Sequence, residues 1–351
     1  HILIKYKMNN YGLLGGIDEN LVEKRKKLDI KDKKILCYLS EDCRIPLTHL
    51  KKEIQLSRDG INYRIKNMLK QKLIIQFIPR INFRSLNYYD FHVFFNIHEK
   101  NIDEKKEFIN YLKSKNYVRK IMEYSGRYSI EIVILAQNIV EFDKYISDLS
   151  DNSIIAQKEK MQIIKGYISS HLPKQIFNDV KLRQIRKYKP FEIQKIDSKD
   201  MKILKILSYD ARIPYYNIAQ KINLSGEATK YRIEKLKKNT IRKFSCLVNL
   251  SMMNYHWFTV LIKTKKFNSD YEKKLRKIIE YNPNILKVVK TLGSWDFILY
   301  IVANNHRHFH ETMKEIIHEL SETISNYETL LAYKEHMYNP MPQIISKVFN
   351  K

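Results

Sequence analysis

The stretch "LSRDGINYRIKNM" (residues 56–68) returns downstream as "LSGEATKYRIEKL" (residues 224–236). Both versions open with Leu-Ser and carry Tyr-Arg-Ile at the same later place. The match extends without a gap from residues 28–74 to residues 196–242, with Asp29 on Asp197, an offset of 168. Self-similarity of this length indicates an internal duplication.

The second part of each copy is more diverged but keeps its pattern. The segment "YVRKIMEYSGRYSIEIVIL" (117–135) aligns with "ILKVVKTLGSWDFILYIV" (285–302), and Gly126 falls on Gly293. The offset is 167 here, so one residue has been lost between the halves. We therefore predict two copies of about 150 residues each, joined by residues 169–195.

The net charge is strongly positive, with 64 Lys and Arg against 38 Asp and Glu, which leaves +26. Such a field attracts polyanions, most often nucleic acid. Part of the lysine excess is also explained by an A+T-rich coding bias, because the chain is rich in Lys, Ile, Asn and Tyr and has only 8 Gly and 8 Pro. No run approaches the roughly 18 apolar residues of a membrane span, so we expect a soluble, cytoplasmic protein without a membrane partner.

Neither the cysteines nor the histidines predict a metal site. Cys37, Cys43 and Cys246 lack ligand spacing, and we expect buried thiols in a reducing cytoplasm. In "HRHFH" (306–310), His306 and His310 have a metal-type spacing on a predicted helix. No partner ligand stands at a fixed spacing, so an exposed helix start is the preferred interpretation, and we expect no metal and no cofactor.

The first part of each copy has the pattern of three short helices. Asp29 begins the first helix as an N-cap, with Asp32 three residues later in a capping-box arrangement. Ser57 caps the third helix, and the β-branched run "LIIQFIPRINF" (73–83) then predicts a strand hairpin. Three helices and a hairpin describe a winged helix-turn-helix domain, predicted over residues 28–83 and 196–250.

The second part of each copy alternates strands and helices in the order βαββαβ. In the first copy we predict strand 88–97, helix 103–115, strands 117–125 and 129–137, helix 139–150 and strand 154–165. In the second copy we predict strand 254–264, helix 268–281, strands 285–292 and 295–303, helix 305–320 and strand 324–336. This order is that of a ferredoxin-like sandwich, in which one sheet face is left needing a partner.

The predicted fold class is therefore α+β. Two winged helix-turn-helix domains are each followed by a ferredoxin-like domain, over residues 84–168 and 251–340. A tail (1–27), a basic linker (169–195) and a second tail (341–351) complete the chain.

The opening "LD..D..IL..L..D.RI", followed by "LS......RI..L" and a βαββαβ unit with Gly after its second strand, resembles the leucine-responsive regulator (Lrp/AsnC) family. The resemblance covers residues 28–166 and 196–340. Members usually carry one unit per chain and pair through their βαββαβ (RAM, or AsnC-type) sheets, often assembling further. The resemblance implies a tandem version, with an intrachain pseudo-dimer and further homo-oligomerisation left open. It also implies a DNA-binding transcriptional regulator and not an enzyme.

The third helix of each copy is the candidate recognition element, because such a helix enters the major groove of double-stranded DNA. The predicted contacts are Ser57, Arg58, Asn62, Tyr63, Arg64 and Lys66, and in the second copy Ser225, Thr229, Lys230, Tyr231, Arg232 and Lys235. The serines are equally expected as caps, and the tyrosines alternatively pack on the neighbouring helix. Arg64 and Arg232 suit a phosphate contact, which the nearby positive charge favours, or a salt bridge that holds the fold.

The exposed positions of the two recognition helices differ in sequence, as Arg58 against Gly226 and Asn62 against Lys230 show. Base readout would differ at these positions. We therefore expect that the two DNA half-sites need not match.

In the Lrp/AsnC family the loop with the sheet glycine contributes to a small-molecule effector pocket, commonly for an amino acid. The resemblance points to Gly126, Arg127, Tyr128 and Ser129 in the first copy, and to Gly293, Ser294, Trp295 and Asp296 in the second. The first copy has Ser129 where the second has Asp296. The alternative, which we favour, is that the glycines only make a turn and the aromatic side chains pack.

An enzyme is the second hypothesis, since the chain also resembles the siroheme decarboxylases, which reuse this two-part fold as fused pairs. That activity needs an anionic-porphyrin pocket lined by His and Arg near the first sheet strand. The first copy offers Arg80, Arg84 and His92 there, and the second only His256. A non-catalytic architectural module is the third hypothesis.

Overall fold

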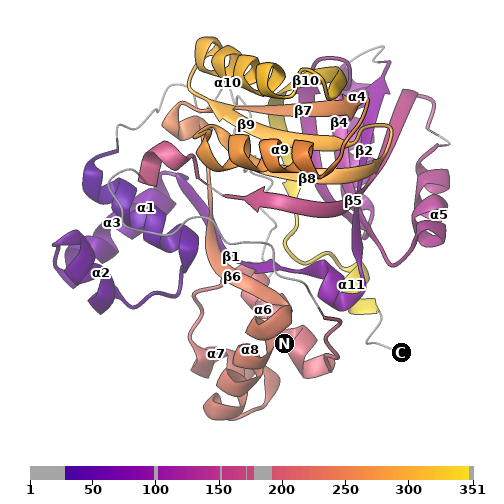
Figure 1. The fold of residues 1–351 in the computed structure, drawn as a ribbon. Helices are drawn as coiled ribbons and strands as arrows, with labels where there is room; N and C mark the ends of the chain where they lie inside the picture. The colour runs from indigo at the N-terminus through magenta and orange to yellow at the C-terminus, as the bar shows by residue number, and fades with distance from the viewer. Residues whose placement is uncertain (1–27, 99–101, 151, 171, 178–191, 348–351) are drawn as a thin grey trace.

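A computed structural model describes residues 28–98, 102–150, 152–170, 172–177 and 192–347. The predicted N-terminal tail and most of the predicted basic linker lie outside these ranges. The chain forms two helix-turn-helix modules, a two-stranded ribbon and a closed eight-stranded barrel (Figure 1). Within the described ranges, every helix is too short or too polar to cross a bilayer.

The two helix-turn-helix modules have the predicted three helices each. They are α1 (Ile30–Glu41), α2 (Leu47–Ile54) and α3 (Arg58–Lys70), and α6 (Ser198–Tyr209), α7 (Tyr215–Ile222) and α8 (Gly226–Asn239). Asp197 and Asp200 form a complete capping box at α6, and Asp29 accepts the equivalent backbone hydrogen bond at α1. Ser57 and Ser225 cap α3 and α8 through their hydroxyl groups. The sequence-predicted caps are therefore present.

A two-stranded antiparallel ribbon lies between the modules, made of β1 (Ile74–Ile81) and β6 (Ile241–Val248). Phe77 stands opposite Cys246, and Ile78 opposite Ser245. The prediction of a strand hairpin within each copy is wrong. Each copy supplies one strand, whose backbone groups find their partners in the equivalent strand of the other copy. Equivalent strands that meet antiparallel place a pseudo-two-fold axis between them.

Both second parts have the predicted order βαββαβ. The first copy contributes β2 (Tyr89–Ile97), α4 (Ile102–Ser114), β3 (Val118–Ser125), β4 (Ile130–Ala136), α5 (Ile139–Ser150) and β5 (Ile155–Ser169). The second contributes β7 (His256–Thr264), α9 (Ser269–Tyr281), β8 (Ile285–Gly293), β9 (Phe297–Ala303), α10 (His306–Glu319) and β10 (Ile324–Tyr338).

The two sheets join edge to edge in one closed barrel, with the strand order β10-β3-β4-β2-β5-β8-β9-β7. Strands β5 and β10 have 15 residues each and close the barrel, because each crosses from its own sheet to the other copy's sheet. Closure leaves no unpaired edge strand in the described barrel. The barrel thus pairs the two sheets within one chain, the arrangement that the family resemblance implies for a tandem version.

Stacked phenylalanine pairs fix one helix to the barrel in each copy. Phe91 of β2 stacks on Phe142 of α5 with ring centroids 4.1 Å apart, and Phe258 of β7 stacks on Phe309 of α10 at 3.9 Å. Phe309 belongs to the "HRHFH" segment, whose histidines at 306, 308 and 310 are exposed. The described residues contain no group of three metal-ligating side chains.

A buried carboxylate lies inside the barrel. Glu131 of β4 is fully buried and accepts hydrogen bonds from His92 at 2.5 Å and from the Tyr124 hydroxyl at 2.6 Å, while the Lys120 ammonium lies 3.3 Å away. Burial alone would raise the pKa of Glu131. The charge of Lys120 and the hydrogen bonds outweigh that effect and hold this pKa well below its usual range. Burial lowers the pKa of His92.

The second copy completes this network with different residues. Tyr124 also bonds to the Thr259 hydroxyl at 2.9 Å, and the Tyr300 hydroxyl lies 3.4 Å from Glu131. The position equivalent to Glu131 is Ile298, which is fully buried as well. The two halves of the barrel interior are therefore not interchangeable.

Short segments after the last strand of each copy pack against the body of the protein. They contain η3 (Lys174–Phe177) and α11 (Ile344–Lys347). Leu172 and Ile345 are fully buried. Residues 172–177 and 341–347 were predicted as parts of a linker and a tail. Their shared Pro and Ile spacing, "LPKQI" against "MPQII", is a repeat signal that extends the duplication.

Candidate nucleic-acid interface and effector pocket

The outer faces of α3 and α8 carry most of the predicted DNA contacts. Tyr63 and Tyr231 are 71% and 72% exposed, which favours a role at the surface over packing on the neighbouring helix. The other exposed predicted residues are Ser57, Arg58 and Lys66, and Ser225, Lys230 and Lys235. Asn62 is half-buried beside them. Each helix therefore presents hydrogen-bonding groups and cations on one face.

Arg64 holds the start of α1 instead of projecting from α3. Its Nη1 atom lies 2.7 Å from Asp29 and 2.8 Å from Asp32. Arg232 repeats this arrangement at 2.7 Å from both Asp197 and Asp200. Of the two placements open from sequence, the geometry favours the salt bridge that holds the fold, because both arginines are already committed to carboxylates.

Thr229 was predicted as a DNA contact, and the structure corrects this. Its side chain is fully buried in α8. Thr229 aligns with Ile61, which is fully buried in α3, so both face the module core. The alignment of the two copies alone would have identified this position as buried.

Backbone contacts across the ribbon place the two modules relative to each other. The Cys43 N–H donates to the Phe244 carbonyl at 3.2 Å, and the Ala211 N–H donates to the Phe77 carbonyl at 3.0 Å. These two bonds are pseudo-symmetric. They connect each helix-turn-helix turn to the other copy's strand, so the two recognition helices stand on one shared support (Figure 1).

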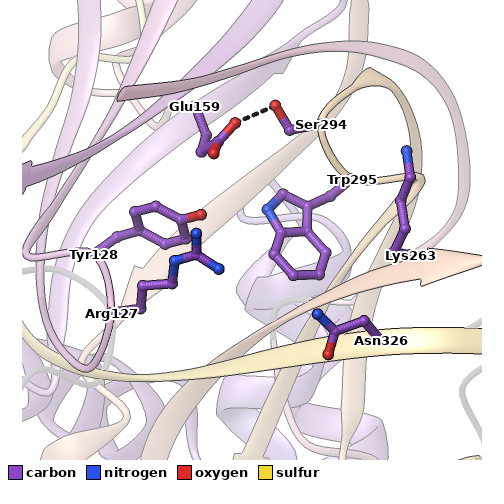
Figure 2. Close-up of a pocket in the computed structure, with 7 residues that line it drawn as sticks. All are labelled: Arg127, Tyr128, Glu159, Lys263, Ser294, Trp295 and Asn326. Atoms are coloured by element: carbon purple, nitrogen blue, oxygen red, sulfur yellow. Dashed lines mark hydrogen bonds between the residues drawn. The ribbon is translucent and has the colours of Figure 1, made fainter. Parts of the chain in front are cut away.

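A pocket of about 200 Å³ lies where the two glycine-bearing loops converge. It is lined by Arg127, Tyr128, Glu159, Lys263, Ser294, Trp295 and Asn326 (Figure 2). Tyr128 and Trp295 are buried, whereas Arg127 is exposed. The Ser294 hydroxyl donates to the Glu159 carboxylate. The pocket thus combines two aromatic walls with groups of both charges.

Two features of this pocket are suited to a ligand. The Tyr128 hydroxyl is buried next to Trp295. It makes no hydrogen bond of ordinary geometry to any described residue. Arg127 makes no ion pair within the described part of the chain. The Arg127 guanidinium lies 5.3 Å from the centroid of the Tyr128 ring. A buried hydroxyl without an ordinary hydrogen bond and a guanidinium without an ion pair are groups that a polar small molecule would satisfy.

Four of the eight loop residues to which the resemblance points line this pocket, namely Arg127, Tyr128, Ser294 and Trp295. Asp296 does not line it, because its carboxylate accepts hydrogen bonds from the Thr264 N–H at 2.7 Å and from the Thr264 hydroxyl at 2.9 Å.

Gly126 and Gly293 have a structural role instead. Their φ angles are +139° and +143°, and each lies against the backbone of the neighbouring long strand. The sequence analysis favoured this interpretation, in which both glycines only make a turn.

Sequence reasoning missed three lining residues, Glu159, Lys263 and Asn326. They come from β5, β7 and β10, far apart in the chain. No local motif links them, and only the pairing of the two sheets brings them together.

The residues considered for a porphyrin pocket have other partners. His92 is 3% exposed and bonded to Glu131 inside the barrel. Arg80 donates to the Tyr338 hydroxyl at 3.2 Å, and Arg84 donates to the Ile163 carbonyl. The structure therefore does not assemble them as an accessible His- and Arg-lined site.

These features define a protein with two winged helix-turn-helix modules on one ferredoxin-like barrel. Three family models match it. They are the winged helix-turn-helix DNA-binding model over residues 28–75, the AsnC-type helix-turn-helix domain over 196–237 and the Lrp/AsnC ligand binding domain over 258–342.

Known proteins extend this match. An uncharacterized HTH-type transcriptional regulator of Pyrococcus horikoshii is 31% identical over 141 residues, covering 39% of this chain and 90% of that protein. The regulatory protein AsnC of Haemophilus influenzae is 27% identical over 150 residues, covering 42% and 94%. The chain belongs to the Lrp/AsnC family. Each of these relatives is about as long as one of its two copies.

Among solved structures, the siroheme decarboxylase NirDL has a TM-score of 0.62 and covers 91% of this chain and 97% of its own. Its sequence identity is 13%. At this identity the likeness concerns the fold, here a similar arrangement over nearly the whole chain, and function has to be argued from the site.

Proposed function

We propose that this protein is a transcriptional regulator that reads duplex DNA with two non-identical helix-turn-helix modules carried by one chain. The observation that carries the proposal is the pair of exposed faces on α3 and α8, mounted on a shared ribbon. Their exposed tyrosines, and cations such as Arg58 and Lys230, suit phosphate and base-edge contacts. The net charge of +26 adds long-range attraction to DNA.

Half-site asymmetry follows from the same faces. Where α3 presents Arg58 and Asn62, α8 presents Gly226 and Lys230. A homodimer presents two identical helices to a palindrome. The chain is therefore expected to select an operator with two different half-sites.

Selection of duplexes from a random pool tests this proposal. We expect a bipartite, non-palindromic sequence whose affinity falls steeply with salt, in proportion to the phosphates contacted. Exchanging Arg58 and Asn62 for the residues at 226 and 230, and vice versa, should reverse the preferred orientation of the operator. Selection of a palindrome, or no salt-dependent duplex binding, would contradict the proposal.

We further propose that the pocket of Figure 2 binds a small effector with the charge pattern of an amino acid. The Arg127 guanidinium is placed to bind a carboxylate, Glu159 to bind an ammonium group, and Trp295 with Tyr128 to enclose a side chain. A pocket of about 200 Å³ has room for a ligand of that size.

Calorimetric titration with each of the twenty amino acids tests this second proposal. Binding of one or a few of them, lost in Arg127→Ala and in Trp295→Ala, is the expected result. Lys290→Ala, outside the lining residues, is the control. If no amino acid binds, or if binding survives both pocket changes, the effector assignment fails while the DNA-binding proposal stands.

A further inference from the structure

Arg44 directly connects the two helix-turn-helix modules. It belongs to the turn between α1 and α2 of the first module. Its Nη1 atom donates to the backbone carbonyl of Ala211 at 2.6 Å and to that of Ile213 at 3.0 Å, both in the α6–α7 turn of the second module. The guanidinium also lies over the Tyr215 ring, 4.3 Å from its centroid.

Other residues also restrict the Arg44 side chain. The Phe244 ring of β6 lies 5.4 Å from the same guanidinium. The backbone of the turn is fixed next to it, because the Cys43 N–H bonds to the Phe244 carbonyl. Two hydrogen bonds and a stacked ring restrict the guanidinium in both position and orientation.

The equivalent residue in the second module, Arg212, keeps the ring contact, because Phe77 is the counterpart of Phe244, but it lacks the two bonds to carbonyl groups. Its guanidinium lies 5.2 Å from the centroid of the Phe77 ring and donates no hydrogen bond to the chain in the described ranges.

The backbone hydrogen bonds of the two residues before these arginines, Cys43 and Ala211, are pseudo-symmetric. The two turns therefore differ in the contacts of the arginine side chains. Within the described ranges, the side-chain hydrogen bonds that run directly from one helix-turn-helix turn to the other are therefore one-sided. Arg44 donates both of them, in addition to the pseudo-symmetric contacts across the ribbon.

We propose that Arg44 is a positioning residue that sets the spacing between the two DNA half-sites that this chain accepts. This inference rests on the proposed DNA-binding function. Arg44 acts through the second module, because it fixes the α6–α7 turn, and with it α8, relative to α3. Rigidly held recognition helices accept one centre-to-centre distance, since each added base pair both shifts and rotates the next half-site.

The experiment uses the duplex selected by the wild-type chain, with zero, one or two base pairs added or removed between its half-sites. Affinities are measured for the full-length wild type, Arg44→Ala, Arg44→Lys and the matched control Arg212→Ala. Circular dichroism verifies that each variant is folded at the assay temperature. Arg44→Lys keeps the positive charge but lacks the planar group that bonds two carbonyls and stacks on Tyr215.

We expect the wild type and Arg212→Ala to lose roughly tenfold in affinity for each base pair of mis-spacing. In Arg44→Ala and Arg44→Lys the loss should shrink to about twofold, with nearly unchanged affinity for the optimal duplex and an unchanged salt slope. A general weakening of the fold would lower affinity at all spacings alike and would leave the spacing profile as in the wild type.

Two outcomes overturn the inference. If Arg44→Ala keeps the wild-type spacing profile, Arg44 does not set the spacing. If it weakens binding equally at every spacing and lowers the salt slope by about one, Arg44 contacts a phosphate instead. A wild-type chain that binds no duplex would refute the proposed function itself, which is a separate result.

Discussion

The two helix-turn-helix modules agree in the contacts that hold them together and differ on the faces they expose. Arg64 in the first module and Arg232 in the second bridge the same two carboxylate positions at 2.7 to 2.8 Å. On the outside, Arg58 is replaced by Gly226. The two copies have therefore kept the salt bridges that hold each module together, while the exposed faces proposed to contact DNA have diverged.

In the barrel the two copies differ in the interior, whereas the helix-turn-helix modules differ at the surface. The first copy buries Glu131 with its donors, and the second buries Ile298 at the equivalent place. The close partners of Glu131 belong to its own copy, and the second copy adds the Tyr300 hydroxyl at 3.4 Å. Four predictions test how far the two copies differ.

The largest effect is expected at Glu131. Glu131→Ala leaves Lys120 and His92 buried without their anion, which should cost about 3–5 kcal/mol in the free energy of unfolding. Ile298→Val at the equivalent position should cost about 1 kcal/mol. Urea unfolding measures both. Equal costs at the two positions would show that the polar network contributes no more than its apolar counterpart.

The next largest effect is expected at the loop glycines. A side chain is strained at both, because φ is near +140°. A Cβ at Gly293 would also overlap the Lys160 carbonyl oxygen, whereas one at Gly126 would meet the Leu330 side chain at 3.0 Å. Gly293→Ala should therefore destabilise the protein by about 2–3 kcal/mol, and Gly126→Ala by about 1 kcal/mol less. Thermal unfolding of both variants compares them, and a reversed order would contradict the structure.

Smaller, matched losses are expected at the two arginines. Arg64→Ala and Arg232→Ala should each cost about 1–2 kcal/mol, because each leaves a buried aspartate unpaired at a partly exposed site. The exposed Lys66→Ala is the control and should leave stability unchanged. DNA affinity measured well below the unfolding temperature should fall more in Lys66→Ala than in Arg64→Ala. The opposite order would restore Arg64 as a phosphate contact.

The smallest effect is expected from acid. Burial lowers the pKa of His92 in the folded chain below its unfolded value of about 6.5. The unfolded chain therefore takes up this proton first, and the stability is lost as the pH falls below about 6.5. The thermal midpoint should drop between pH 7 and pH 5, and His92→Gln should reduce that drop. An unchanged drop would show that other groups cause it.

The duplication made much of the fold predictable. The caps at Asp29 and Ser57 and the order βαββαβ are local patterns, and each was present twice. The single ribbon strand was misread as a hairpin, because its partner lies 167 residues away in the other copy. The prediction of Thr229 as a DNA contact was wrong because it considered α8 alone. The aligned residue in α3 is Ile61, whose apolar side chain indicates a buried position.

The sequence by itself determined the two modules, their helices and strands, and the exposed faces that differ between them. These follow from periodicity and capping, which act within a few residues. Only the tertiary structure decided which arginine joins the modules, which residues line the pocket and which carboxylate is buried in the barrel. The bond from Arg44 to Ala211, the bond from Ser294 to Glu159 and the contact of Tyr300 with Glu131 each link residues more than 100 positions apart. Their geometry is fixed by how two similar but unequal copies pack around one axis.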